Sequence, residues 1–117
     1  MWNDSSQSAS ETGVLVAKTL TLVTKATAAA GTGVPLVGSE TFVTKVWLNA
    51  KRAGAANTGV VYIGTSTVDK TSIQQMALAP GDAIVIEMPA GTKLNLATIY
   101  VDSATTADGV TGWYIPA

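Results

Sequence analysis

The sequence predicts a single all-β domain, an antiparallel β-sandwich of seven or eight strands, which follows an extended N-terminal arm. Three observations support this fold class. Short segments rich in Val, Ile, Thr and Tyr recur along the chain, and turn signals such as Pro80-Gly81 and Asp108-Gly109 separate them. No segment shows the apolar period of a convincing amphipathic helix. Short strands at regular spacing are typical of a β-sandwich or a barrel.

The composition limits the number of domains and the classes of partner. The chain has 117 residues, of which 47% are hydrophobic, and this suffices for one domain with a real core. Only 13% of the residues are charged, and seven basic residues nearly cancel eight acidic ones. A nucleic-acid site requires clustered Lys and Arg, so we expect no nucleic-acid binding. A surface so poor in charge favours coverage by a protein partner.

The chain carries no sign of export or of a membrane segment. It contains no cysteine, and hence no disulfide framework. Its first residues lack the basic start and the apolar run of a signal peptide. No apolar stretch approaches the length that spans a bilayer. We therefore expect neither a signal peptide nor a membrane partner.

Residues 1–13 are predicted to form a flexible or extended arm, and residues 14–117 the sandwich domain. Ser, Asn, Asp, Gln and Glu dominate the arm, which cannot form a core of its own. Trp2 is its single large apolar residue. Two interpretations of Trp2 remain open: a solvated residue next to the initiator Met, or an anchor that binds a neighbouring subunit.

The first strand is predicted over residues 14–24, where β-branched residues dominate. Leu20 and Leu22 share one of its faces. Residues 25–40 contain several Gly and small residues and are predicted to form a connection. A short edge strand around Pro35–Val37 is compatible with that connection because proline is tolerated at a sheet edge.

Residues 41–50 show the clearest strand alternation in the chain. The predicted core face consists of Phe42, Val46, Leu48 and Ala50, with Thr44 among them, and the predicted outer face of Val43, Lys45, Trp47 and Asn49. Trp47 then lies among polar neighbours on the outer face. Either loops of the same chain cover it, or it anchors a subunit interface, where tryptophan is enriched.

Further strands are predicted after the Asn57-Thr58-Gly59 turn. They cover residues 60–64, 83–88, 94–102 and 110–115, and residues 65–77 hold either a short strand or one helical turn. The segment 60–64 is apolar throughout, as expected for a strand covered on both faces. Trp113 and Tyr114 in the last strand are interpreted as core or strand-end packing.

The residue types argue against catalysis. The chain has neither His nor Cys, which removes the commonest general base, a common metal ligand and the thiol nucleophile. Its eight acidic residues are spread one by one, mostly at turns, and nothing in the sequence pairs two of them as glycoside hydrolysis requires. We therefore predict a protein that is not an enzyme, with no catalytic residues, no cofactor and no metal site.

One set of turns and strand ends carries a resemblance to a known class of proteins. It consists of Asn57-Thr58-Gly59 before Val61-Tyr62-Ile63-Gly64, then Pro80-Gly81-Asp82, Leu96, Ile99-Tyr100-Val101-Asp102, and Asp108-Gly109 before Trp113 and Tyr114. In these features the segment 57–115, about half of the chain, resembles small virion proteins of tailed bacteriophages that decorate or cap the capsid.

The resemblance implies a jelly-roll-like sandwich, frequently trimeric, that binds the outside of an assembled capsid as a decoration or cement protein. It implies the major capsid protein as partner, a location on the virion and synthesis in the host cytoplasm. Trp2 and Trp47 are then the candidate interface residues. A carbohydrate- or receptor-binding module of a phage fibre or tail remains the alternative, because it accounts equally for the sandwich and for exposed aromatic residues.

Overall fold

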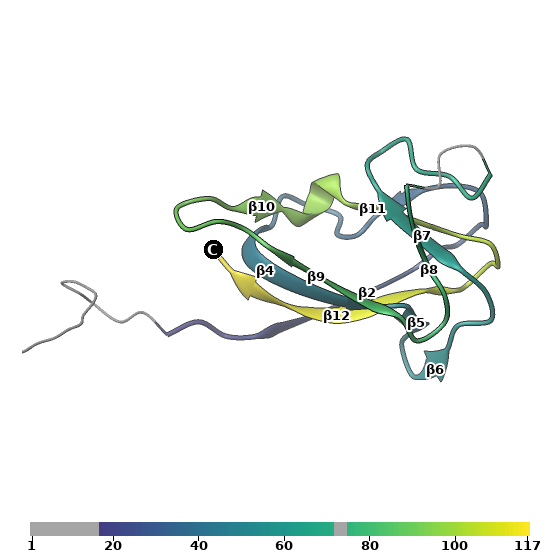
Figure 1. Cartoon of the computed structure of the whole chain (residues 1–117), viewed down its shortest axis with the longest axis horizontal. Coiled ribbons are helices and arrows are strands. Elements are labelled where there is room, and N and C mark those ends of the chain that lie inside the picture. Colours follow the sequence, from purple (N-terminus) through teal and green to yellow (C-terminus); the bar gives the residue numbers. More distant parts are fainter. Residues whose placement is uncertain (1–16, 72–74) are drawn as a thin grey trace, which may run out of the picture.

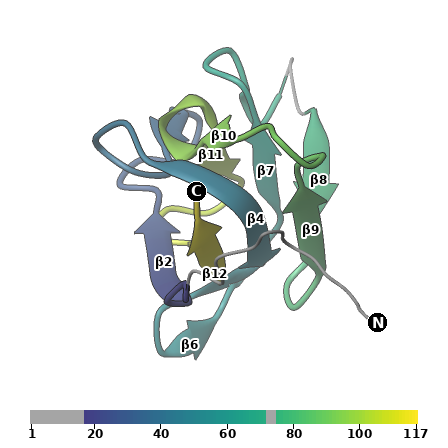
Figure 2. The ribbon, with the colours of Figure 1, turned by 90° about the vertical axis from the view of Figure 1, so that its left-hand side faces the viewer.

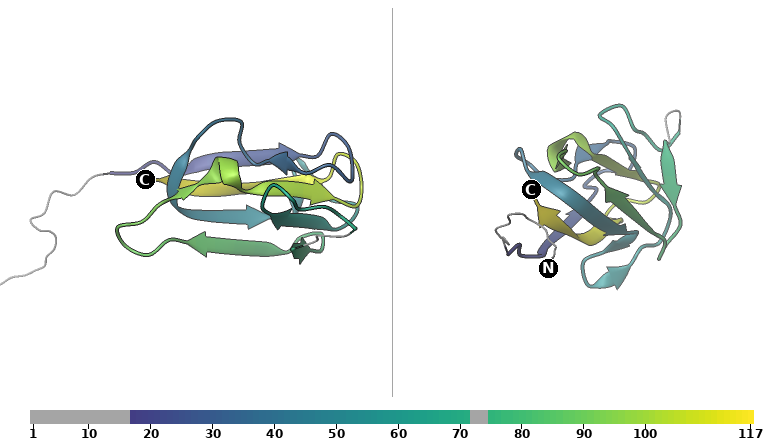
Figure 3. Two further views of the ribbon diagram at one scale, coloured as in Figure 1. Left: turned by 90° about the horizontal axis from the view of Figure 1, so that it is seen from above. Right: turned by 60° about the vertical axis from the view of Figure 1, so that its left-hand side comes forward.

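The computed structural model describes residues 17–71 and 75–117, which form two antiparallel sheets and a small hairpin (Figure 1). The larger, five-stranded sheet consists of β2 (Thr21–Ala26), β12 (Gly109–Pro116), β4 (Phe42–Asn49), β9 (Ala83–Glu87) and β10 (Leu94–Asn95). Strand β12 pairs with β2 on one side and with β4 on the other. The far side of β4 pairs with both β9 and β10. The strands run side by side along the domain (Figure 3).

The second sheet has four strands in the order β3 (Val34–Pro35), β11 (Tyr100–Ser103), β7 (Val61–Gly64) and β8 (Met76–Leu78). Strand β3 lies at its edge, where a proline is tolerated, as predicted for this segment. The hairpin pairs β5 (Lys51–Arg52) with β6 (Ala55–Ala56). A 3-10 helix, η1 (Leu96–Thr98), separates β10 from β11.

Side chains from both sheets form one hydrophobic core, and Figure 2 shows the strands around it. Val46, Leu48 and Val110 come from the larger sheet, and Val61 and Val101 from the smaller one. All five are at most 1% exposed. The predicted all-β class is therefore confirmed, and the arrangement is consistent with a β-sandwich. Over the described residues, no helix has the length and apolar character needed to cross a membrane.

Two predicted strand boundaries differ from the structure. Of the strand predicted over residues 14–24, the described part is β2, which begins at Thr21, and residues 17–20 form no strand. Residues 14–16 lie outside the described residues, as do Trp2 and the predicted arm. The strand predicted over 94–102 is interrupted by η1. The side-chain oxygen of Asn95 accepts a hydrogen bond from the Ala97 N–H at 3.1 Å, which caps this helical turn. A local side-chain cap thus overrides the β-favouring composition of the segment.

The predicted alternation of β4 holds in its second half and fails in its first. Ile115 pairs with Lys45, whereas the next residue, Pro116, pairs with Val43, so the register shifts by one residue at this point. Such a bulge reverses which side chains face the core. Val43, predicted on the outer face, is therefore fully buried, and Phe42, predicted in the core, is only partly buried.

A buried carboxylate ties two turns together at one end of the domain. Asp108 is fully buried, and its side-chain oxygens accept hydrogen bonds from the N–H groups of Thr58 at 2.9 Å and Gly59 at 2.7 Å. In return, the Asn57 amide donates to the Gly109 carbonyl at 2.8 Å and accepts from the Gly109 N–H at 3.1 Å. The two turns therefore satisfy each other's backbone groups, and β12 begins from a fixed position.

A second buried carboxylate, Asp102, does the same for two other loops. It is fully buried and accepts hydrogen bonds from the N–H groups of Gly31 at 2.9 Å, Lys70 at 2.8 Å and Ser103 at 2.8 Å. The hydroxyl of Ser103 lies against that of Thr27. Hydrogen bonds of backbone N–H groups to an ionised acceptor are stronger than neutral ones, so both carboxylates act as structural ties.

We predict that Asp108→Asn lowers the free energy of unfolding by about 2–3 kcal/mol, because the new amide group turns a donor towards the donating N–H groups of Thr58 and Gly59. Urea denaturation measures the change. Glu40→Gln removes the same charge from an exposed side chain and should change stability by less than about 0.5 kcal/mol. Equal stability of the two variants would contradict the structural role of Asp108.

Candidate functional site

Four apolar side chains form a continuous band across the outer face of the larger sheet. In register, Leu22 of β2 lies opposite Trp113 of β12, Trp113 opposite Trp47 of β4, and Trp47 opposite Val85 of β9. Directly opposed residues of an antiparallel sheet project from the same face and interact as cross-strand pairs. The band, defined here as Leu22, Trp113, Trp47 and Val85, thus spans the sheet from β2 to β9.

The band is open to solvent although it is apolar. Leu22 is 55% exposed, Trp113 48% and Val85 52%, and Trp47 is partly buried between its neighbours. Leu20, two residues before Leu22 and on the same face, is 51% exposed. Scattered surface hydrophobic residues need no explanation, but a contiguous apolar patch of this kind marks a contact site.

The rows on either side of the band combine polar and apolar residues. On one side, Thr24, Thr111, Asn49 and Ala83 lie opposite one another in the same register. On the other side, Lys45 lies between Ile115 and Glu87, and the side chains of Lys45 and Glu87 form a salt bridge of 3.8 Å. The Lys45 ammonium nitrogen lies 4.8 Å from the centroid of the Trp47 ring. Polar groups around an apolar centre are usual in a protein interface.

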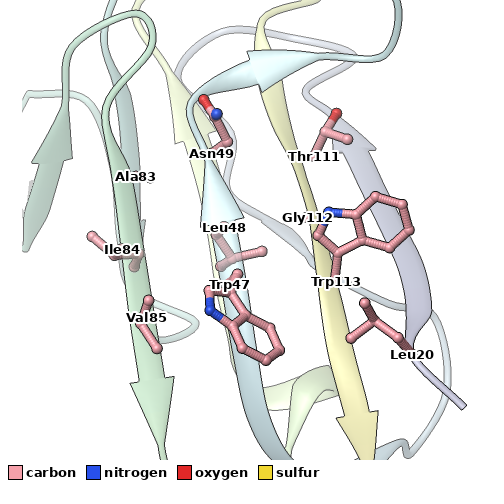
Figure 4. A pocket seen from close by; sticks show the side chains of 10 residues that line it. All are labelled: Leu20, Trp47, Leu48, Asn49, Ala83, Ile84, Val85, Thr111, Gly112 and Trp113. Carbon is pink, nitrogen blue, oxygen red and sulfur yellow. The ribbon is translucent and has the colours of Figure 1, made fainter.

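A groove with a cavity volume of about 300 Å³ runs along the band. Figure 4 shows the two indoles projecting from the adjacent strands β4 and β12, with Val85 and Leu20 at its two sides. Thr111 and Asn49 close one end. The Asn49 side-chain oxygen is buried and has no hydrogen-bond partner among the described residues. Every residue that lines the groove belongs to a strand of this sheet or, for Leu20, to the segment just before one.

The structure places one of the two predicted interface residues. Trp47 lies on the outer face, as the alternation predicts, and the described residues that line the groove around it belong to strands or, for Leu20, to the segment just before β2. Trp2 lies outside the described residues. The interpretation of Trp113 as core or strand-end packing is wrong, because Trp113 lies within β12 and is half exposed. Tyr114 does pack against the core.

The outward position of Trp113 could have been predicted from the alternation of residues 110–114. In residues 110–114, Val110 and Gly112 are buried and Tyr114 packs against the core, so Thr111 and Trp113 must face outward. Reading the segment as a two-residue alternation would have placed Trp113 beside Thr111. The partners of Trp113 could not be predicted, because they depend on the pairing register of three strands.

No group of three or more acidic, His or Cys side chains lies close enough to hold a metal ion within residues 17–71 and 75–117. The two buried carboxylates, Asp102 and Asp108, are engaged by backbone N–H groups.

Comparisons with known proteins found no similar protein. No family model, no curated protein and no solved structure matches the chain.

Close approach of two backbones sets the spacing of the two tryptophans. Gly112 precedes Trp113, and a side chain at Gly112 would place its Cβ 1.7 Å from the carbonyl oxygen of Trp47. Any residue larger than glycine therefore pushes β12 away from β4. The band depends on a glycine that is not itself part of it.

We predict that Gly112→Ala destabilises the domain by about 1–3 kcal/mol, because the methyl group overlaps the Trp47 carbonyl. Thermal and urea denaturation measure the loss, and the fluorescence of the adjacent indoles reports the altered strand spacing. Gly38→Ala is the matched control. Its methyl group would have no atom within 4 Å, so this variant should be neutral or slightly stabilising. Equal effects at both positions would refute the close approach.

Proposed function

We propose that the protein is a structural virion protein of a tailed bacteriophage, which binds the outside of the capsid as a decoration or cement protein. In this proposal it is a jelly-roll-like homotrimer, it is not an enzyme, and its partner is the major capsid protein. The single observation that carries the proposal is the band Leu22–Trp113–Trp47–Val85, a half-exposed apolar face that another protein would cover.

The band has the composition of an interaction hot spot. Tryptophan is enriched among residues that dominate binding energies, and such residues cluster at the centre of an interface. Here two tryptophans lie side by side at the centre of the face, with aliphatic side chains outside them and rows that include polar residues beyond. Covering this face removes apolar surface from water without leaving a buried charge unpaired, since Lys45 and Glu87 pair with each other.

The turns that carry the resemblance to phage virion proteins have a structural role in this fold. The Asn57-Thr58-Gly59 and Asp108-Gly109 turns bind each other through the side chains of Asn57 and Asp108. The strand end at Asp102 ties two further loops. These residues stabilise the framework, and the band is the feature on which the proposed role in assembly rests.

Symmetric display explains how a small domain would bind a shell firmly. A trimer that meets a symmetric site makes each contact three times, and linked contacts increase the overall affinity well beyond that of one contact. Each copy therefore needs only a modest interface. This fits a chain with few charged residues and no large cofactor-binding cavity among its described residues.

Cosedimentation with capsids tests the proposal. We predict that the purified protein binds capsids of the virus that encodes it and saturates at a fixed ratio to the shell subunits. Trp113→Ser and Trp47→Ser should each weaken binding about tenfold or more, because hot-spot truncations cost at least 1–2 kcal/mol. Met76→Ser alters an equally exposed apolar side chain of the other sheet and should bind normally. A wild-type protein that stays in the supernatant would refute the proposal.

A carbohydrate- or receptor-binding module of a phage fibre or tail is the second candidate. Two adjacent indoles could stack on sugar rings. A sugar hydroxyl near Asn49 would give its side-chain oxygen the donor that it lacks among the described residues. A groove of about 300 Å³ falls at the lower end of the range for small-ligand sites.

If this second function is correct, the isolated protein binds glycans without any capsid. Glycan arrays followed by titration calorimetry measure this, with Asn49→Ala expected to weaken binding and Met76→Ser expected to leave it unchanged. Capsid binding without glycan binding supports the decoration role, and the reverse result supports the fibre or tail module.

A further inference from the structure

We propose that the groove along the band receives the N-terminal segment of a neighbouring copy of the same chain, with Trp2 as the residue that enters it. The inference rests on the oligomeric assembly that the proposed function includes, and it names the partner of the band. The donor is residues 1–16 of one copy, and the acceptor is the outer face of the larger sheet of the next.

The acceptor is shaped for one large apolar side chain. The groove holds about 300 Å³, has the indoles of Trp47 and Trp113 along it, and is bordered by Val85 and Leu20 (Figure 4). Trp2 is the single large apolar residue of the predicted arm, residues 1–13. Aromatic residues pack favourably against other aromatic rings in offset or edge-to-face arrangements. Trp2 therefore matches the groove in both size and chemistry.

The course of the chain favours a neighbour over the chain's own groove. Residues 17–20 continue from β2 along the domain and run outward past the C-terminal end (Figures 1 and 3). Leu20 already borders the groove and the chain leaves it in the outward direction, so Trp2 could return to this groove only if the segment reversed its course. The described residues just before Leu20, Ala17, Lys18 and Thr19, include neither glycine nor proline, the usual turn residues.

The segment is long enough to reach another copy. Sixteen residues precede Ala17, and a fully extended chain spans about 3.3–3.6 Å per residue, so the segment reaches about 55 Å at most. Trp2 lies near its far end and can therefore meet the face of an adjacent subunit. The polar residues between Trp2 and the domain are suited to cross the solvent-exposed space between subunits.

The charges of donor and acceptor are complementary. The segment 1–16 carries Asp4 and Glu11 and has no basic residue. All seven basic residues belong to the described domain, together with six acidic ones, of which Asp102 and Asp108 are fully buried. The solvent-facing charge of the domain is thus positive and that of the segment negative. Lys45, whose ammonium group lies at the Trp47 ring, is beside the groove, where it also pairs with Glu87.

A mixing experiment with full-length point variants separates donor from acceptor. Trp2→Ser lacks the donor and keeps the groove, whereas Trp113→Ser lacks the groove residue and keeps the donor. Sedimentation velocity over a range of concentrations measures the association of each protein. We expect the wild type to form oligomers and each variant alone to associate at least tenfold more weakly. An equimolar mixture should form a one-to-one pair, because one donor and one acceptor remain intact. Met76→Ser should associate like the wild type.

Each other outcome overturns the inference. A monomeric wild type, or a Trp2→Ser variant that associates like the wild type, shows that the segment does not join copies. If both variants are monomeric and their mixture fails to pair, Trp2 does not enter the groove of another copy. If Trp2→Ser associates like the wild type and Trp113→Ser does not, the band contacts a second band instead of the segment. Cosedimentation with capsids is a separate readout, so a monomer that still binds capsids refutes this inference and the homotrimer and leaves the proposed capsid decoration standing.

Discussion

The start of strand β12 is the constraint on which the outer face depends. Asp108 is buried without an ion-pair partner among the described residues, and it is held by the N–H groups of Thr58 and Gly59. The Asn57 side chain binds both backbone groups of Gly109, the first residue of the strand: it accepts from the N–H and donates to the carbonyl oxygen. Since the side-chain period of a strand is two residues, a slip of one residue would turn Trp113 into the core and Tyr114 outward. The tie therefore determines which aromatic side chain reaches solvent.

The same register brings distant segments into one band. Leu22, Trp47, Val85 and Trp113 are separated by tens of residues, and each is an ordinary strand residue on its own. They meet only because β12 lies between β2 and β4, and β9 follows on the far side of β4. Gly112 adds to this by letting the two tryptophan-bearing strands approach closely. The band on the outer face therefore depends on the pairing of strands that are distant in sequence, and no local sequence motif specifies it.

Local patterns were sufficient for the fold class and for part of the site. The turn signals at Asn57-Thr58-Gly59 and Pro80-Gly81 lie between strands as predicted, and Asp108-Gly109 leads into β12. Trp47 faces outward as its alternation requires. The predictions failed where a single residue reversed the inward–outward alternation of a strand or changed the backbone conformation from strand to helical turn. The bulge in β4 turned Val43 inward, and the Asn95 cap replaced strand with a 3-10 turn. Neither the bulge nor the cap can be recognised from the residue types of its segment, so the sequence pattern could not predict them.

The residues that stabilise the framework differ from those that form the exposed band, and this limits what a resemblance in the turns implies about function. Asn57, Asp102 and Asp108 act inward, on backbone groups of neighbouring loops, and they stabilise the framework. The band acts outward, and apart from Trp113 it lies outside the motif that resembles phage virion proteins. Proteins that share the turns would therefore share the framework while presenting different faces, because a fold supports many functions through the sites built on it. In the proposed role, the two tryptophans and their aliphatic neighbours decide what this chain contacts, and the partner covers an apolar face that few charges protect.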